Sequence, residues 1–326
     1  MPTVSVVVPG RNCAATIRDC LEAMQVIAAA PGSPVIELLY VDDHSRDDSA
    51  SLAAGCGATV LACAGTGAGA ARNAGWRHAS GAFVWFVDSD CVARANALAL
   101  LLPLLDAPEV AAVGGSYDNH CPDSLLACMI HEEIVARHRA MPRDVDFLAT
   151  FNVLYRREAL QQLDGFDERY LRGQDAELSF RAVRAGRKLR FEARSRVAHF
   201  HERRLLPYLK AQYRQGYWRA YLHMEHTGRA SGDSYSRLSD HLQPPLAMLA
   251  LAALPLLLVP GAAWLVALPP AGVVLLQLPM ALRLLRGNGP ALAIGFAAMS
   301  SARAFWRGVG LSLGVIAKLT ERRGTR

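Results

Sequence analysis

Two aspartates one residue apart, Asp88 and Asp90, are the side chains of this chain whose spacing most directly suggests chemistry. They follow the apolar run from Phe83 to Val87, which predicts a buried strand. In an extended chain residues i and i+2 project to the same side, so both carboxylates can face one point. Carboxylate oxygens are the ligands that hard divalent cations prefer. Because such pairs also occur in ordinary solvated turns, the other strand ends must decide between the two interpretations.

The first 115 residues alternate strand-like and helix-like segments, which is typical of a parallel sheet with crossover helices. Strands are expected at residues 4–8, 36–41, 58–63 and 82–87. Asn12 can cap the helix that follows the first strand. The second strand ends in Asp42-Asp43 and the third in a glycine loop. Ligands of open α/β sheets bind beyond the carboxyl ends of the strands, so these residues are expected near the aspartate pair.

The glycine loop leaves a second class of protein open. Residues Gly65 to Ala70 fit the pattern G-x-G-x-x-A after a strand, and Asp88 lies about 20 residues further on, as in dinucleotide-binding folds. This pattern is compatible with an NAD(P)-dependent oxidoreductase that uses the Gly65–Gly69 loop. Against it, an earlier strand already ends in acids, and the loop is followed by Arg72-Asn73, which suit phosphate and sugar recognition.

Four segments in this order resemble family 2 glycosyltransferases of the GT-A fold. They are Val4–Pro9, Asp42-Asp43-x-Ser45, Gly69-x-Ala71-Arg72-Asn73-x-Gly75 and Asp88-x-Asp90. The resemblance continues with Asn152, Arg156–Leu160, Gly165–Glu168 and Gly173–Leu178, and it covers about residues 3–225. Each motif alone is common, whereas their order and spacing make the match specific.

The resemblance implies a metal-dependent, inverting, hexosyltransferase-like enzyme that uses Mg²⁺ or Mn²⁺ and a UDP- or GDP-sugar. Asp88 and Asp90 would hold the cation, with His199 as a further ligand and His201 as its alternative. The residues implied to contact the nucleotide-sugar lie at the strand ends and in the helix after the glycine loop. They are Pro9, Asn12, Asp42, Asp43, Arg72, Asn73 and Asp88.

The same resemblance assigns Asp175 as the catalytic base, which would draw the proton from the acceptor hydroxyl. Asp175 can also simply cap the helix that follows it. Asn152 and Gln174 are expected to contact the acceptor. Gln174 stands where the family usually has Glu, so a non-catalytic, membrane-anchored protein that has kept the fold stays open as a third class.

The C-terminal part of the chain has the composition of a membrane segment. No charged residue occurs from Leu242 to Leu282, and this run would be about 60 Å long as helix, twice the bilayer core of about 30 Å. We therefore expect a transmembrane hairpin at about residues 244–284, broken at Pro269-Pro270, rather than a hairpin buried in a soluble core. Residues 291–317 are expected to form an interfacial helix, because Arg303 and Arg307 interrupt them.

These patterns predict an α/β protein of the GT-A type in three parts. Residues 1–115 would form the nucleotide-sugar half, 116–228 the acceptor half and 240–326 the membrane-associated helices. Arginines flank both ends of the hairpin, and the start of the chain lacks the pattern of a signal peptide. The expected location is therefore a bacterial inner membrane, with the catalytic domain in the cytoplasm.

The net charge of +6 is concentrated between Arg181 and Arg214, directly before the apolar segment. Such a cluster suits anionic headgroups or a phosphate-bearing substrate, and it favours a lipid-linked or membrane-presented acceptor. No nucleic-acid-binding motif accompanies the charge, so nucleic acid is not expected as a partner. The seven cysteines contain no C-x-x-C pair, which predicts reduced packing residues rather than a disulfide framework.

Overall fold

The structure, a computed structural model, describes residues 3–229 and 232–324, which form two compact units. The sheet unit comprises the residues up to His120 together with His138–Phe200, and the helical unit comprises Cys121–Arg137 and the residues from His201 onward. This division differs from the three parts expected from the sequence. The reason is strand pairing, because residues on both sides of position 115 belong to one sheet.

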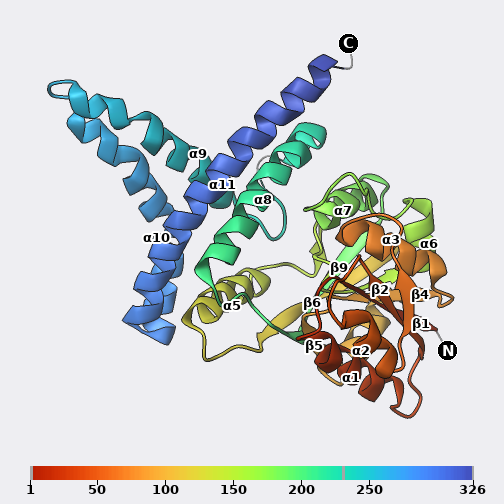
Figure 1. Cartoon of the computed structure of the whole chain (residues 1–326). Helices are drawn as coiled ribbons and strands as arrows, with labels where there is room; N and C mark the ends of the chain where they lie inside the picture. Colours follow the sequence, from red (N-terminus) through yellow and green to blue (C-terminus); the bar gives the residue numbers. More distant parts are fainter. Residues whose placement is uncertain (1–2, 230–231, 325–326) are drawn as a thin grey trace. The chain divides into compact units, whose positions relative to one another are not determined.

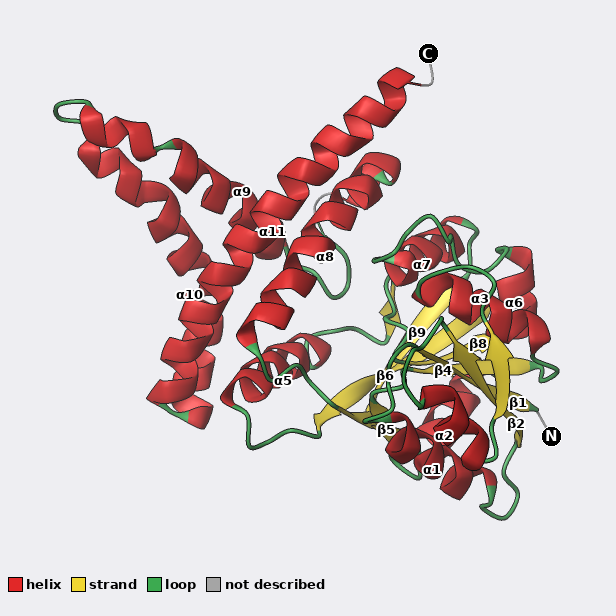
Figure 2. Ribbon diagram, viewed as in Figure 1, coloured by secondary structure: helices red, strands yellow, loops and turns green. Residues whose placement is uncertain are grey.

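One mixed sheet forms the centre of the sheet unit, with the strand order β3-β2-β1-β4-β8-β6-β9-β5 (Figure 2). The four strands expected in the first half are present and parallel: β1 Val4–Gly10, β2 Val35–Asp42, β3 Thr59–Ala62 and β4 Phe83–Val87. The strands added to them are β8 Asn152–Arg156, β6 Val110–Asn119, β9 Lys188–His199, β5 Cys91–Ala93 and β7 Asp144–Val145, the last pairing with β9.

Helices cover both faces of this sheet (Figure 1). On one face lie α1 Ile17–Ala28, α2 Ser49–Gly55, α4 Ala97–Leu101 and the 3₁₀ turn η1 Leu102–Leu105. On the other lie α3 Ala68–His78, α6 Arg157–Gln162 and α7 Gln174–Arg184. Trp85 and Phe86 are neighbours in β4, are fully buried and enter opposite cores, as the alternation of a strand requires. The sheet is thus held rigidly from both sides.

The direction of the strands decides which residues meet at one edge. β8 runs antiparallel to β4 and to β6, and β9 is parallel to β6, so β9 runs in the same direction as β4. The last residue of β9 is His199, and β4 ends just before Asp88. His199 and the aspartate pair therefore lie at the same edge of the sheet, far apart in sequence but close in space.

Two expected helix caps are not formed. Asn12 has φ +51° and does not cap α1, which begins at Ile17. Its Oδ1 instead accepts a 2.8 Å hydrogen bond from the backbone N–H of Arg46, so Asn12 ties the loop after β1 to the loop after β2. Asp175 lies in the first turn of α7, whose N-cap is Gly173.

In the helical unit, α8 Leu205–Glu225 packs along α11 Pro290–Gly324 (Figure 1). A short 3₁₀ helix, η2 Thr227–Arg229, follows α8. Glycines make this packing close. A Cβ atom at Gly310 would overlap the backbone oxygen of Tyr213, and one at Gly314 would overlap that of Tyr217. Side chains at these two positions would therefore force the helix backbones apart.

Buried charges join three helices of this unit. Arg303 of α11 is 6% exposed, and its guanidinium donates to both carboxylate oxygens of Glu133 in α5 Leu125–His138. Arg137 donates to Glu133 at 2.7 Å and to Asp240 of α9 Leu238–Ala252 at 2.8 Å. Burial opposes ionisation of Glu133, but the two arginines outweigh it and lower its pKa to about 2. Each of these buried charges has an opposite partner.

The apolar segment forms a helical hairpin, as expected (Figure 1). Two stretches, Leu238–Leu258 and Ala263–Asn288, are long and apolar enough to cross a membrane, and only 17% and 11% of their most apolar windows are buried. They include α9, the 3₁₀ turns η3 Leu254–Leu258 and η4 Ala263–Ala267, and α10 Leu268–Asn288. Since the core helix of a soluble protein would be mostly buried, the hairpin is compatible with a membrane anchor.

The break in the hairpin is not where the sequence suggested. Pro269-Pro270 occupy the first turn of α10, where a missing N–H costs no helical hydrogen bond. The chain reverses at residues 259–262 instead, where Gly261 has φ +79°, a conformation that glycine adopts without strain. Residues 291–317 lie within the single long helix α11.

Candidate active site

The aspartate pair lies in the short turn between β4 and β5. Oδ1 of Asp88 accepts a 2.6 Å hydrogen bond from Nη2 of Arg72. The backbone oxygen of Asp90 accepts a 3.0 Å hydrogen bond from the N–H of Phe200, which fixes the turn against the end of β9. The side chains of Asp88 and Asp90 are 33% and 44% exposed, so both remain accessible to a ligand.

His199 is the histidine that meets this pair. Its Nε2 lies 3.4 Å from Oδ2 of Asp90. Burial disfavours charge on both groups, but their attraction outweighs it, raising the pKa of His199 and lowering that of Asp90. The alternative, His201, belongs to the helical unit, where its ring lies 5.6 Å from that of His131.

The donor atoms at this edge fit a divalent cation. Asp90, His199 and Cys91 each offer one ligand atom, and the three atoms lie within 4.8 Å of one another. The carboxylate of Asp88, two residues before Asp90 in the same turn, also acts electrostatically on the His199 ring. Carboxylate oxygens suit Mg²⁺ and Mn²⁺, and an imidazole nitrogen is a good ligand for the borderline transition metals.

Arg72 is a buried cation with unused donors. Its side chain in α3 is only 5% exposed, and its ion pair with Asp88 engages Nη2 alone. Nε and Nη1 are buried and have no hydrogen-bond partner within residues 3–229 and 232–324. Buried N–H groups are nearly always paired, so these two point to a ligand or to ordered water.

Asp175 sits in the first turn of α7, where its Oδ1 accepts a 2.8 Å hydrogen bond from the N–H of Ala176. Burial raises the pKa of Asp175 above its ordinary value; Arg72 opposes the shift and Asp88 adds to it. The three residues are therefore within electrostatic range of one another. A carboxylate with a raised pKa is a better proton acceptor than an ordinary one.

Asp42 and Asp43 end β2 beside the same edge. Asp42 accepts hydrogen bonds from Tyr40 and from the N–H of Ser45, at 3.2 and 3.1 Å. Asp43 is 6% exposed, and its Oδ2 accepts a 3.0 Å hydrogen bond from the N–H of Gly67. Its Oδ1 is buried without a partner in the described part of the chain, which leaves one carboxylate oxygen for a ligand donor. The buried Pro9 pairs with Val41 in the sheet beside these acids.

The family model described as glycosyltransferase-like family 2 matches residues 2–217. The chain belongs to glycosyltransferase-like family 2. Among similar proteins, the pre-mycofactocin glycosyltransferase of Mycobacterium tuberculosis is 30% identical over 223 residues, 62% of this chain and 43% of that relative. Glycosyltransferase AglE of Haloferax volcanii is 27% identical over 206 residues, 59% of this chain and 64% of that protein. The chain thus spans less than two thirds of either relative.

A solved structure shows the fold. The mannosyltransferase PcManGT of Pyrobaculum calidifontis, determined with GDP-mannose and Mn²⁺, matches with a TM-score of 0.62 at 18% identity. The match covers 97% of this chain and 87% of that one. The α/β fold of the GT-A type expected from the sequence is confirmed for this family 2 chain.

The glycine loop of the family 2 domain is in contact with neighbouring side chains. The N–H of Gly67 is used by Asp43, and a Cβ at Gly65 would lie 3.2 Å from the carboxylate of Glu168. Gly69 faces the side chain of Gln174 at ordinary contact distance. A dinucleotide-binding loop needs this space for a pyrophosphate at the helix N-terminus. The geometry therefore disfavours the oxidoreductase alternative.

Two predicted ligand contacts have their amides occupied within the domain. Asn73 is 1% exposed and exchanges hydrogen bonds with the backbone N–H and oxygen of Phe166, at 2.9 and 2.8 Å. Asn152 is fully buried in β8, where its Oδ1 accepts a 3.0 Å hydrogen bond from the indole of Trp85. These contacts favour a role in holding the site together, which differs from the nucleotide and acceptor contacts expected.

Gln174, which stands where the family usually has Glu, differs from Asn73 and Asn152 in that its amide oxygen is not occupied by the described part of the protein. It is 7% exposed at the start of α7, and its Oε1 is buried without a hydrogen-bond partner among the residues described. Its position beside Asp175 keeps the predicted acceptor contact geometrically reasonable.

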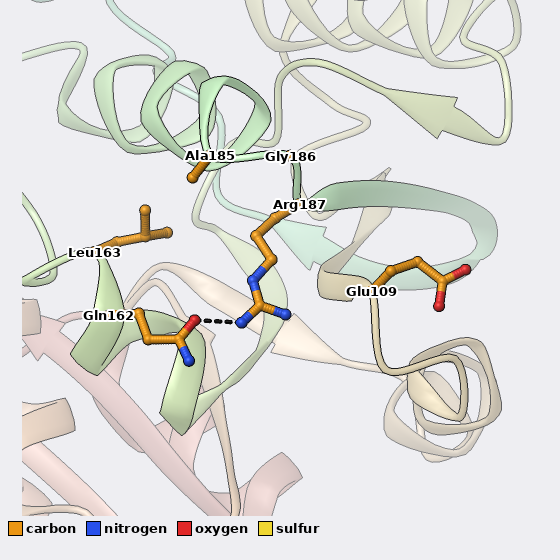
Figure 3. Close-up of a pocket in the computed structure, with 6 residues that line it drawn as sticks. All are labelled: Glu109, Gln162, Leu163, Ala185, Gly186 and Arg187. Atoms are coloured by element: carbon orange, nitrogen blue, oxygen red, sulfur yellow. Dashed lines mark hydrogen bonds between the residues drawn. The ribbon is translucent and has the colours of Figure 1, made fainter.

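A cavity of about 400 Å³ lies away from these residues (Figure 3). It is lined by Glu109, Gln162, Leu163, Ala185, Gly186 and Arg187. Glu109 and Arg187 come just before β6 and β9, so the cavity is at the amino ends of these strands, whereas His199 lies at the carboxyl end of β9. Its arginine is held by Gln162. The cavity is not part of the candidate site.

Sequence reasoning missed Cys91, which it grouped with the packing cysteines. The only local signal was that Cys91 directly follows Asp90. Its position opposite His199 depends on the pairing of β5 with β9, which no local pattern reveals.

Proposed function

We propose that this family 2 chain is a metal-dependent inverting glycosyltransferase that moves a sugar from a nucleotide-diphosphate sugar to an acceptor hydroxyl at a membrane surface. The observation that carries the proposal is the cluster at one sheet edge. Asp90 and His199 offer ligand atoms to one cation at this edge, and Asp88, which acts electrostatically on His199, also acts on Asp175, a carboxylate whose burial raises its pKa.

In the proposed reaction Asp175 takes the proton of the acceptor hydroxyl. The oxygen attacks the anomeric carbon from the side opposite the leaving group, the bond from that carbon to the diphosphate breaks, and the configuration inverts. When bound, Mg²⁺ or Mn²⁺ would supply positive charge for the departing diphosphate. The arginine that pairs with Asp88 adds further positive charge from the protein itself.

Recognition of the nucleotide-sugar would use the buried polar atoms of the sheet unit that have no hydrogen-bond partner among the described residues. Oδ1 of Asp43 can accept from a base N–H or ribose hydroxyl, with Asp42 beside it. Nε and Nη1 of Arg72 can donate to diphosphate oxygens. Pro9 and Asn12 would shape the loop around the nucleotide, while Asn73 supports it indirectly. The mannosyltransferase of similar fold was solved with GDP-mannose and Mn²⁺, which supports a GDP- or UDP-sugar.

The acceptor is proposed to be lipid-linked or otherwise presented at a membrane. The exposed apolar hairpin supports a membrane anchor. We propose the bacterial inner membrane, with the catalytic domain in the cytoplasm, because arginines flank both ends of the hairpin. At the start of α8, Leu205 and Leu206 are more than half exposed directly after Arg203 and Arg204, a combination that suits an anionic bilayer surface. Gln174 would contact the acceptor beside the base.

The test is turnover by the full chain in detergent, with UDP- and GDP-sugars, Mn²⁺ and lipid-phosphate acceptors. Wild-type protein should release nucleoside diphosphate, and Asp90→Ala should not, whereas Asp106→Ala, an exposed aspartate outside the site, should keep full activity. Full turnover by Asp90→Ala would refute the assigned roles. Nucleotide binding without turnover on any acceptor would instead favour the non-catalytic alternative that Gln174 left open.

A further inference from the structure

Cys91 faces the same point as His199. The two residues are directly opposite in the antiparallel pair of β5 and β9. Directly opposite residues of an antiparallel pair project to the same face of the sheet, with Cβ atoms about 5 Å apart. The Asp90 backbone oxygen accepts a hydrogen bond from the N–H of Phe200, and the Asp90 carboxylate lies beside the His199 ring. Three different side-chain types thus converge through the strand register.

The distances match those around a single cation. Sγ of Cys91 lies 3.7 Å from Oδ1 of Asp90, and Nε2 of His199 lies 3.4 Å from Oδ2 of the same carboxylate. A tetrahedral ion with bonds of about 2.0 Å to O and N and about 2.3 Å to S keeps its ligand atoms about 3.3–3.6 Å apart. The two distances are close to these values, and the ligand atoms of the three residues all lie within 4.8 Å of one another.

Burial gives the cluster an inner and an outer side. Cys91 is fully buried and is a free cysteine, whereas the Asp90 and His199 side chains are 44% and 20% exposed. The sulfur therefore lies on the protein side of the cluster, and the exposed side is left for a ligand oxygen. This is the arrangement of a site with three protein ligands and an open position.

We infer that Cys91 is a sulfur ligand of the cation site and that the site binds Zn²⁺ and Co²⁺ more tightly than Mg²⁺. The inference rests on the proposed function, because it adds a ligand to the same site. On binding, the thiol releases its proton to solvent and a sulfur–metal bond forms, with no oxidation or reduction. Thiolate and imidazole favour borderline metals, whereas Mg²⁺ prefers oxygen ligands alone.

The experiment uses Co²⁺ as a probe on the full-length protein in detergent. Wild-type protein titrated with Co²⁺ should develop the near-ultraviolet sulfur-to-cobalt charge-transfer band at one equivalent. Cys91→Ser should lose this band, while Cys56→Ser, a buried cysteine in the loop after α2, should keep it. Calorimetry should show Zn²⁺ affinity reduced at least about tenfold in Cys91→Ser, with Mg²⁺ affinity unchanged.

The outcomes separate this inference from the proposed function. A wild-type protein that transfers sugar with Mn²⁺ but shows no charge-transfer band overturns the role of Cys91 alone, and so does a band that survives in Cys91→Ser. A wild-type protein that binds no divalent cation overturns both proposals. Should Cys91→Ser fail to fold, Cys91→Ala, which places no polar group at this fully buried position, takes its place and should lose the band.

Discussion

The sheet unit and the helical unit each bury an arginine, and the two arginines differ in how many of their N–H groups have hydrogen-bond partners. Arg303 in the helical unit donates to Glu133, Ser300 and Tyr208. Arg72 in the sheet unit donates to Asp88 alone, and its Nε and Nη1 are buried without partners in the described ranges. Both side chains are less than 10% exposed, so burial does not explain the difference.

Hydrogen-bond partners distinguish a buried charge that stabilises the fold from one that is available to a ligand. Leaving a buried donor unpaired costs free energy, so a protein keeps one only where something else satisfies it. Orphaned oxygens accompany the orphaned arginine donors in the sheet unit, on Asp43 and Gln174. We therefore assign Arg72 to ligand binding and the pair of Arg303 with Glu133 to stability, and four predictions test this assignment.

The largest effect is expected from Asp175→Asn. Removing the proposed base should lower kcat by about 10²–10⁴-fold. The melting temperature should not fall, because Asn keeps the acceptor for the N–H of Ala176 and no longer places a charge where burial disfavours it. Steady-state kinetics and thermal unfolding in detergent measure the two effects, with the exposed Asp106→Asn as control. Near-normal kcat would remove Asp175 from the mechanism.

Glu133→Gln tests the other side of the comparison. It leaves Arg303 and Arg137 without their shared carboxylate, and breaking such a buried pair costs about 3–5 kcal/mol. Because the pKa of Glu133 is lowered to about 2, its stabilising contribution is present above the ordinary value of 4.5 and is lost as the pH falls towards 2. Thermal unfolding should show a large drop, and Glu132→Gln, its neighbour in the same helix, should show little change. An equal melting temperature in both variants would contradict the structural role.

Arg72→Met should show the opposite pattern. It removes two unpaired donors together with one ion pair to a partly exposed aspartate, so stability should change by about 1 kcal/mol or less. Donor affinity should fall at least about tenfold, because the diphosphate loses a charged hydrogen-bond partner. Calorimetry with UDP or GDP and Mn²⁺ measures the affinity. A strongly destabilised variant that binds the nucleotide normally would reverse our assignment.

The smallest effect concerns pH. Because burial raises the pKa of Asp175, the base is protonated at a higher pH than an ordinary aspartate. The activity of the wild type should therefore fall on the acid side through that raised pKa, about tenfold per pH unit below it. A profile of kcat/KM between pH 4 and 9 should show the acid-side loss of activity at a higher pH than an ordinary aspartate would give. The Asp106→Asn variant is the control and should give the same profile. An acid limb at the ordinary aspartate pKa would show that another group is the base.

Local patterns predicted those parts of the fold and site that depend on neighbouring residues. The run of Phe83–Val87 followed by acids is visible in the sequence because strand and turn are adjacent. The closeness of His199 to Asp90 was implied only by family resemblance, since it arises from the pairing of β5 with β9 across about a hundred residues. The partners of the Asn73 and Asn152 amides, Phe166 and Trp85, are far away in sequence and cannot be read from spacing.

The turn of the hairpin could not be located from the sequence either, although only neighbouring residues are involved. Pro269-Pro270 and Pro260-Gly261 are both reasonable breaks by composition. Proline fits the first turn of a helix as well as it fits a loop, so the prolines alone could not distinguish the start of α10 from the turn before it.

The central claim is that the carboxyl edge of the sheet holds a cation and the diphosphate of a nucleotide-sugar. Anomalous scattering from crystals soaked with Mn²⁺ and either UDP or GDP tests it most directly. We predict a manganese peak bounded by Asp88, Asp90 and His199, with the diphosphate next to it and the nucleoside against Asp43. No peak at these residues, with the nucleotide bound on the Gly65–Gly69 loop instead, would contradict the account.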